Sequence, residues 1–409
     1  MNAFKPLTHS NSEKSKRGSE LGSLLHSTPI VEIETLVVGG DGLARIEFQQ
    51  KQVVVFVPRS APGDQLKIKI TAAEKNHLLG EIIEIIKPSE ARRHAPCVYY
   101  DKCGGCNWQH VTEDMQVSQK EKILTGLMQK FLPDVTYTLQ PLVRSDKNFN
   151  YRNRIQLKQI GSQLGYFKRG SHDIVDIDAC LIAEEEISKQ ITEVKKKLRP
   201  SQEVRKFELR LNHEEKFESY PIGQDGEGLS FAQVNRGVND ALVKTVKDMV
   251  LKIAPTVVTE LYAGAGNFTF PLVAALPQAL FEAVELNSKL TQFAALKISK
   301  QSLQKRLFFF TSDCESFTDR RSLSAELVLL DPPRAGCSEQ VLKNISRANP
   351  RHLIYISCHP VHLARDLKFL MKSGDGYRIR YLQVFDMFPQ TDHFETLVWL
   401  EKAESSLTV

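Results

Sequence analysis

The segment Val257-Val-Thr-Glu-Leu-Tyr262 is followed directly by Ala263-Gly-Ala-Gly-Asn-Phe268. The first six residues predict a short buried strand, and the glycine-rich segment predicts a loop that opens a helix. Four further strand-like runs alternate with helical segments after it, at residues 280–285, 307–313, 326–331 and 353–358. This alternation predicts a parallel, doubly wound α/β sheet. The last runs, residues 377–386 and 395–401, lack an intervening helix and predict an antiparallel hairpin that closes the sheet.

Acidic residues end three of these predicted strands, namely Glu285, Asp313 and Asp331. Ligands of open α/β sheets bind at the carboxyl ends of the strands. The glycine loop lacks the third glycine of a dinucleotide fingerprint because Thr269 stands there,. Glu285 could accept hydrogen bonds from ribose hydroxyls, and Asp313 could accept one from an adenine amine. These acids and the glycine loop together fit a nucleoside cofactor without pyrophosphate, such as S-adenosylmethionine. The alternative is that each acid only caps the helix that follows it.

Cys358 ends the apolar run that begins at Leu353 and is followed by His359-Pro360. A thiol at a strand end, a carboxylate in Asp331-Pro-Pro-Arg334 and the late Glu395 together suggest covalent catalysis on a base,. Taken on its own segment, Cys358 also fits a structural cysteine packed in a buried strand.

Four cysteines precede the α/β region, at Cys97, Cys103, Cys106 and Cys180. Four thiolates fit zinc or an iron–sulfur cluster, and their spacing does not separate the two. A redox dithiol of Cys103 and Cys106 is the other option, but the Gly-Gly between them and the flanking Cys97 argue against it,.

Composition places the chain among ordinary globular proteins. Its 409 residues carry a net charge of +5 and include seven cysteines, an odd number that favours a reducing cytosol over a disulfide framework,. No apolar run reaches membrane-spanning length and no signal peptide opens the chain, so we expect a cytoplasmic protein. We expect a monomer without a protein partner, and the mildly basic charge permits a nucleic-acid partner.

Four segments are predicted along the chain. Residues 1–28 have the composition of a disordered tail, and residues 29–88 contain about five β-type runs with glycine turns, which predict a small β-barrel,. Residues 89–222 form a mixed, basic central domain, and residues 223–409 form the α/β domain. In the central domain Arg152, Arg154 and Lys158 alternate with apolar residues on one face of a strand, where they either contact phosphates or form a solvated face,.

Several motifs together resemble the RNA uracil-5 methyltransferases over residues 30–400. They are Cys97-x5-Cys103-Gly-Gly-Cys106-x2-Gln109-His110, Phe231-Ala-Gln233-Val-Asn235, Glu260-Leu-Tyr262-Ala-Gly264-x-Gly266-Asn267-Phe268, Asp331-Pro-Pro-Arg334-Ala-Gly336, Ser357-Cys358-x-Pro360 and His393-Phe-Glu395-Thr396. The β-rich start resembles the family's TRAM domain, an RNA-binding barrel. A chain with both this barrel and the four cysteines resembles the 23S ribosomal RNA branch more than the transfer RNA branch.

The resemblance implies a class I S-adenosylmethionine-dependent methyltransferase fold: a Rossmann-like, mostly parallel sheet, plus an OB-like TRAM barrel and a central α+β domain. It implies Cys358 as the nucleophile and Glu395 as the base that removes the C5 proton of uracil. It further implies cofactor contacts from Gln233, Tyr262, Asn267, Glu285, Asp313 and Asp331, substrate contacts from Phe231 and Asp331, and a 4Fe–4S cluster on Cys97, Cys103, Cys106 and Cys180.

Two positions depart from the family pattern. His359 replaces the usual Asn after the nucleophile, and Phe394 replaces the usual Val before the base. Neither change removes a reacting group, so the resemblance implies S-adenosylmethionine-dependent formation of 5-methyluridine in RNA. A non-catalytic RNA assembly factor would be expected to lack the nucleophile or the base, and an iron–sulfur sensor leaves the Asp331 and Glu395 motifs unexplained.

Overall fold

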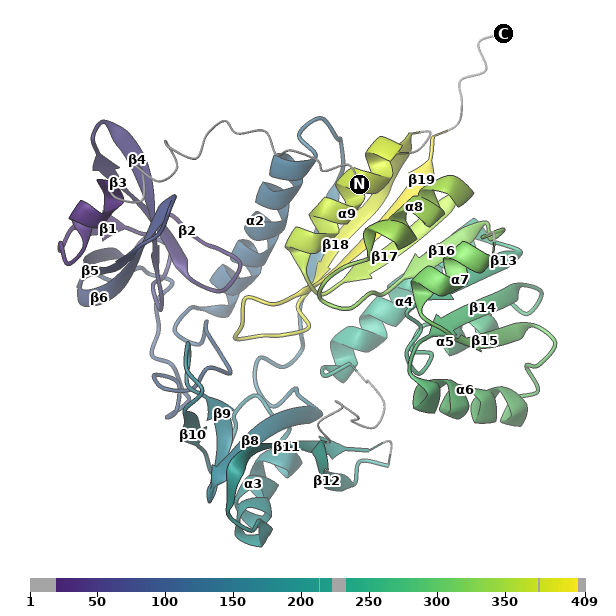
Figure 1. Ribbon diagram of the computed structural model, residues 1–409, viewed down its shortest axis with the longest axis horizontal. Helices are drawn as coiled ribbons and strands as arrows, with labels where there is room; N and C mark the ends of the chain where they lie inside the picture. Colours follow the sequence, from purple (N-terminus) through teal and green to yellow (C-terminus); the bar gives the residue numbers. More distant parts are fainter. Residues whose placement is uncertain (1–19, 213, 223–232, 322, 374–375, 404–409) are drawn as a thin grey trace, which may run out of the picture. The chain divides into compact units, whose positions relative to one another are not determined.

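The computed structural model describes residues 20–212, 214–222, 233–321, 323–373 and 376–403, which form two compact units (Figure 1). The first unit comprises the chain to Tyr100, residues 106–119 and residues 390–392. The second comprises residues 101–105, residues 120–389 and the chain from His393 onward. Phe231 lies outside the described residues, so its expected role is not addressed by the structure.

The first unit is built around a six-stranded sheet in the order β1-β5-β6-β4-β3-β2. Its strands are β1 (Ile30–Glu32), β2 (Thr35–Leu36), β3 (Gly42–Phe48), β4 (Lys51–Val57), β5 (Gln65–Ala73) and β6 (His77–Lys87). On β5, Leu66, Ile68 and Ile70 alternate with less buried residues and point into the core, because neighbouring strand residues face opposite sides,. The first β-type segment of this region is divided into the two short strands β1 and β2. Leu21 is buried in the same core, so packing begins before residue 29.

The second unit holds a five-stranded antiparallel sheet in the order β10-β9-β8-β11-β12. Its strands are β8 (Arg154–Gly161), β9 (Gln163–Phe167), β10 (Ile174–Asp176), β11 (Ser201–Leu211) and β12 (Phe217–Ile222). Helix α3 (Glu185–Lys197) accompanies it and buries Ile187, Ile191 and Val194 along one stripe,.

The same unit holds an eight-stranded sheet in the order β15-β14-β13-β16-β17-β19-β18-β7. Strands β13 (Val257–Leu261), β14 (Leu280–Glu285), β15 (Leu307–Thr311), β16 (Leu327–Leu330) and β17 (His352–Ser357) are parallel. All six residues of β17 and all four of β16 are buried, as expected for central parallel strands covered on both faces,. The predicted hairpin is confirmed as β18 (Tyr377–Phe385) and β19 (Glu395–Lys402).

Strand β7 (Leu139–Val143) was not expected in this sheet. It precedes the five-stranded sheet in the sequence, yet it pairs in parallel with β18 and completes the edge (Figure 1). Its short apolar run contains Pro141, and only tertiary pairing makes it a strand,. Helix α2 (Glu113–Phe131) comes just before β7, and its fully buried Lys120 donates to Asp386 after β18 at 2.5 Å.

Four of the remaining helices connect the parallel strands: α5 (Thr269–Ala275), α6 (Ser288–Lys300), α7 (Cys314–Arg320) and α8 (Glu339–Ala348). Helix α4 (Arg236–Ile253) precedes β13, and α9 (Pro360–Ser373) connects β17 to β18. Asn235 caps α4 by accepting from the Val238 amide at 3.3 Å,. Pro360 opens α9, where its missing N–H costs no hydrogen bond,.

Candidate active site

The register of two antiparallel strands places Cys358 beside Glu395. Ser357 at the end of β17 pairs with Thr396 near the start of β19. The next residue along each strand is therefore Cys358 on one side and Glu395 on the other, and directly opposed residues share a face. Sequence patterns place each residue at a strand end, but only this register shows that the two strands are neighbours.

Burial and charge set the protonation of the pair. Burial, with the nearby Glu395 and Asp331 carboxyls, raises the pKa of the Cys358 thiol to about 12, while the Arg334 guanidinium opposes that rise. Burial also raises the pKa of Glu395 well above its usual range, Asp331 raises it further, and Arg334 lowers it. Burial raises the pKa of Asp331 to about 7. At neutral pH the thiol of the ligand-free site therefore carries its proton.

Arg334 is the functional residue that the sequence reasoning missed, although it lies inside a quoted motif. It is the cation that faces both Cys358 and Glu395. Its Nη2 contacts His393 Nε2 at 3.0 Å, and its carbonyl oxygen lies 2.5 Å from His362 Nδ1. His362 in turn stacks on His359 with ring centroids 4.2 Å apart. The unusual His359, just before α9, is thus part of an aromatic pair with a residue on the first turn of that helix.

The same helix fixes the turn that carries Asp331 and Arg334. Asp366 on α9 is fully buried and accepts from the Tyr355 hydroxyl at 2.7 Å and the Cys337 amide at 2.9 Å. Arg365 donates to the Ala335 carbonyl at 3.0 Å. The segment after the nucleophile therefore holds the neighbouring Asp331 turn through backbone groups.

The glycine loop after β13 leaves room for a ligand. Gly264 has a φ of +57°, and a Cβ placed there would meet nothing within 4 Å. Tyr262, just before it, has a φ of 64°, which is strained for a bulky side chain and is typical of functional loops,. The Glu285 carboxylate accepts from the Gly264 amide at 2.9 Å and from the Asn287 amide at 2.7 Å. The loop is thereby fixed to the end of β14.

The other expected cofactor residues have identified partners. The Asn267 side chain pairs with that of Asn239 on α4, at 2.9 and 3.1 Å. Asp313 is the N-cap of α7 and accepts from the Ser316 amide at 2.8 Å, so the capping alternative describes this residue. Gln233 is buried, and its carbonyl oxygen accepts from Asn153 at 3.0 Å. Their cofactor contacts stay predictions.

Beside Asp331 lies a second buried acid, Glu260 on β13. It is 2% exposed and accepts from the Thr269 hydroxyl at 2.6 Å. Burial, with a smaller effect of Asp331, raises the pKa of Glu260 to about 8. Glu260 is part of one of the family-like motifs, but the sequence alone suggested no role for it. The pattern that could have singled it out is a charged residue inside a buried strand.

The four expected metal ligands are divided between the two units. Cys97 and Cys106 belong to the first, whereas Cys103 and Cys180 belong to the second. In the second unit Cys180 Sγ lies 3.9 Å from the Tyr166 hydroxyl, and both Cys103 and Cys180 help to raise the pKa of that tyrosine. Within the described part of the chain, no group of three or more His, Cys, Asp or Glu is arranged to hold a metal ion.

The basic strand of the five-stranded sheet carries a pair of opposed lysines. Lys158 on β8 is directly opposite Lys206 on β11, and burial together with this neighbour lowers the pKa of Lys158. Arg154 lies four residues before Lys158 on the same strand, and its Nη1 is 3.7 Å from Glu208 Oε2. Opposed like charges destabilise a sheet unless an anion compensates them.

Comparison with known proteins identifies the class that this fold and site define. A crystal structure of Pyrococcus abyssi tRNA (uracil-54, C5)-methyltransferase in complex with S-adenosyl-L-homocysteine matches with a TM-score of 0.67 and 22% identity. The match covers 91% of this chain and 100% of that one. A TRAM domain model matches residues 27–83. The expected fold class, a methyltransferase α/β domain preceded by a TRAM barrel, is confirmed.

Sequence relatives narrow the class to a family. A model described as tRNA (uracil-5-)-methyltransferase matches residues 216–403. A protein of Bdellovibrio bacteriovorus described as an uncharacterized RNA methyltransferase is 40% identical over 396 residues, covering 95% of this chain and 99% of its own. Another from Synechocystis, described likewise, is 29% identical and covers 88% and 93%. The chain belongs to the RNA uracil-5 methyltransferase family. Among the described residues, no helix has the length and apolarity needed to cross a membrane.

Proposed function

We propose that this protein transfers a methyl group from S-adenosylmethionine to C5 of uracil in RNA, with Cys358 as nucleophile and Glu395 as the base. The observation that carries the proposal is the register that sets these two side chains on opposite strands beside Asp331 and Arg334. A thiol, a carboxyl and a cation around one point suit covalent catalysis followed by proton removal.

The residues around Gly264 fit the cofactor. The open space above this glycine admits a ligand close to the backbone, and Glu285 presents a fixed carboxylate at the end of the next strand,. Tyr262, Asn267, Asp313, Asp331 and Gln233 complete the set that would hold it. When bound, S-adenosylmethionine supplies an electrophilic methyl group.

The first step assigned to this chain is addition of the Cys358 sulfur to C6 of uracil. The thiol is protonated in the ligand-free site, because burial and two carboxyls raise its pKa. It must therefore lose its proton as it attacks, and we assign that proton to Asp331, whose pKa of about 7 lies near neutrality,. Arg334 faces the thiol and stabilises the anion that develops. The uracil has to leave its stack to reach this buried point.

The second step is removal of the C5 proton by Glu395. Its Oε2 accepts no hydrogen bond within the described residues, so this oxygen is available for a proton. When the proton leaves, its bonding electrons form the C5–C6 double bond and expel the Cys358 sulfur. The sulfur then recovers the proton held by Asp331, and Glu395 releases the C5 proton to solvent, which makes the site ready for another uracil.

Replacement of the base tests this assignment. Glu395→Gln is expected to lower turnover by about 10²- to 10⁴-fold and to trap a protein–RNA adduct, because general-base catalysis contributes rate factors of that order. Denaturing electrophoresis with labelled RNA measures the adduct. Cys358→Ala is the control and should form none. An adduct that persists in Glu395→Gln/Cys358→Ala would overturn the assignment of the nucleophile.

For the substrate, we propose 23S ribosomal RNA rather than transfer RNA. The support is the combination of the TRAM barrel with four cysteines, which resembles the ribosomal RNA branch of the family. Methyl incorporation into unmodified 23S ribosomal RNA, compared with unmodified transfer RNA, tests the choice. Incorporation confined to transfer RNA would contradict it.

We also propose that Cys97, Cys103, Cys106 and Cys180 hold a 4Fe–4S cluster. None of the seven cysteines, all of which are described, forms a disulfide, and Cys103 and Cys180 both lie near Tyr166. Four thiols are the donor set that such a cluster requires. Anaerobic purification with iron, sulfide and zinc analysis tests the proposal. Stoichiometric zinc without iron would overturn it.

A further inference from the structure

The loop between β18 and β19 leads directly into the catalytic base, and its tip belongs to a different unit from its ends. Gln390, Thr391 and Asp392 are part of the first unit, whereas Pro389 and His393 are part of the second. The three tip residues are only 0%, 3% and 5% exposed, which is unusual for a loop tip,. The tip is therefore a buried structural component of the barrel-bearing unit.

Asp392 is held by a reciprocal pair of hydrogen bonds with Asn107. The Asn107 Nδ2 donates to Asp392 Oδ1 at 2.7 Å, and the Asp392 amide donates to Asn107 Oδ1 at 3.1 Å. The second carboxylate oxygen, Oδ2, accepts from the Gly39 amide at 2.7 Å. Three directed bonds, two of them to a charged group, fix this residue.

Gln390 is held as firmly. Its carbonyl oxygen accepts from the Trp108 amide at 3.0 Å, and its own amide donates to Gln116 Oε1 at 2.9 Å. Its side-chain oxygen accepts from Arg93 at 2.8 Å. Gln390 has a φ of 69°, a left-handed conformation that a non-glycine residue keeps only where its surroundings impose it,.

Glu395 follows Asp392 by only three residues and opens β19. Because its Oε2 makes no hydrogen bond within the described residues, the orientation of the carboxyl depends largely on the backbone that carries it. We propose that the Asn107–Asp392 pair is a positioning device for Glu395: by fixing the loop that leads into β19, it sets the rate at which the base removes the C5 proton. This inference rests on the proposed function.

A displaced base affects one step selectively. The Cys358–C6 bond and the methyl transfer to C5 precede proton removal, so both still occur. Only the final step slows, in which Glu395 takes the C5 proton, the C5–C6 double bond forms and the Cys358 sulfur leaves. We therefore expect covalent adduct to accumulate during turnover while RNA affinity is unchanged.

Exchange of the two side chains provides the test. Asn107→Asp sets two carboxylates against each other, and Asp392→Asn leaves two donors facing each other. Each single change is expected to raise the steady-state adduct fraction at least about threefold and to lower kcat, with the Kd for RNA within about twofold of the original. The double variant Asn107→Asp/Asp392→Asn restores a donor–acceptor pair and should return both values toward the original.

A matched control separates positioning from general destabilisation. Asp64 is a fully buried carboxylate in the same unit that accepts from the Ala61 and Ser89 amides and pairs with Arg92 rather than with Asn107 or Asp392. Asp64→Asn should lower stability without raising the adduct fraction. The inference is overturned if the single changes leave the adduct fraction unaltered, if the exchange fails to restore it, or if Asp64→Asn raises it equally. If Glu395→Gln itself forms no adduct, the proposed function fails instead.

Discussion

The acidic residues in the parallel half of the eight-stranded sheet differ in their hydrogen bonds and burial from those near its antiparallel hairpin. In the parallel half, Glu285 and Asp313 accept backbone N–H groups at strand ends, and the bonds from Ser316 lower the pKa of Asp313. Where the parallel strands meet the antiparallel hairpin, Glu395 is buried and Asp331 is half-buried, and the loss of solvent raises the pKa of both carboxyls. The proposed cofactor-binding acids are thus fixed by backbone hydrogen bonds, whereas the proposed proton-exchanging acids have raised pKa values,.

The largest expected effect in the binding half is at Glu285. Glu285→Gln loses a charged acceptor for ribose hydroxyls and should raise the KM for S-adenosylmethionine about 10- to 100-fold, because such a bond contributes about 1.5–3 kcal/mol. The KM for RNA should change little. Steady-state kinetics with each substrate varied in turn provide the measurement.

The matched control for that change is Glu282→Gln on the same strand. Glu282 pairs with Arg321 at 2.8 Å rather than with the cofactor loop. It should leave the KM for S-adenosylmethionine unaltered. If both variants lowered kcat with unchanged KM, the division of the sheet into a binding half and a reacting half would be wrong.

A second prediction concerns the pH dependence of stability and Glu260, the buried acid on the parallel strand β13. Its pKa is raised from 4.5 to about 8 in the folded protein. Unfolding therefore releases its proton between those values, and stability falls as pH rises through that window, by on the order of 1.4 kcal/mol per pH unit. Glu260→Gln removes this loss, so its free energy of unfolding relative to the original should increase from pH 5 to pH 8. Urea unfolding at both pH values measures it, and a constant difference would contradict the raised pKa.

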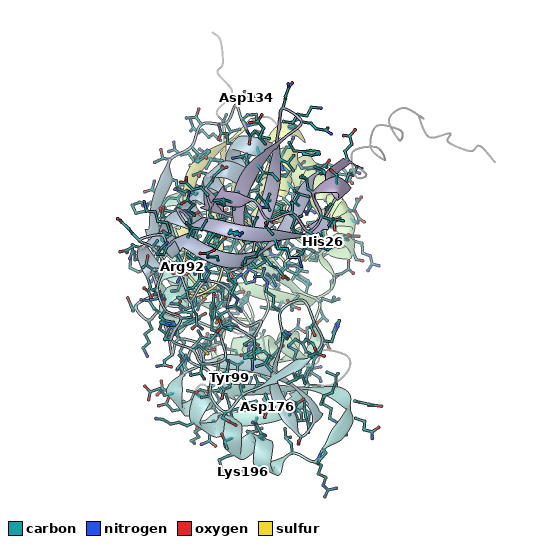
Figure 2. The ribbon with its side chains drawn as sticks, turned by 90° about the vertical axis from the view of Figure 1, so that its left-hand side faces the viewer. His26, Arg92, Tyr99, Asp134, Asp176 and Lys196 are labelled. Atoms are coloured by element: carbon teal, nitrogen blue, oxygen red, sulfur yellow. The ribbon has the colours of Figure 1, made fainter. Side chains whose placement is uncertain are left out.

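The smallest expected effect lies away from both halves, at the opposed Lys158 and Lys206. If RNA phosphates compensate these charges, each change to Ala should reduce the slope of log Kd against log salt by about 0.7, the value for single-stranded nucleic acid. Filter binding at several salt concentrations gives the slope. Lys196→Ala is the control, since this residue of α3 is exposed (Figure 2) and pairs with Glu193. An equal change of slope in the control would refute a specific contact.

Sequence reasoning predicted the parallel strands well, because continuous apolar runs such as that ending at Ser357 have few alternatives in a buried sheet,. It also singled out Cys358 and Glu395 as candidate reacting groups, but their adjacency depends on an antiparallel register between residues far apart in the chain. Tertiary context determined the features that were missed. Strand β7 has weak local preference, Arg334 gains its role from its neighbours, and the burial of Gln390 comes from partners about 280 residues earlier.

The eight-stranded sheet includes one strand, β7, that comes from the part of the chain before the five-stranded sheet. The eight-stranded sheet is therefore incomplete without that part of the chain. Strand β7 covers the outer edge of β18, whose backbone groups at Leu382 and Gln383 it pairs with. A chain shortened to residues 223–409 keeps every proposed reacting group, yet it exposes that edge as a template for strands of other molecules. Self-association through β18, rather than loss of chemistry, is the failure to expect when the α/β region is produced alone.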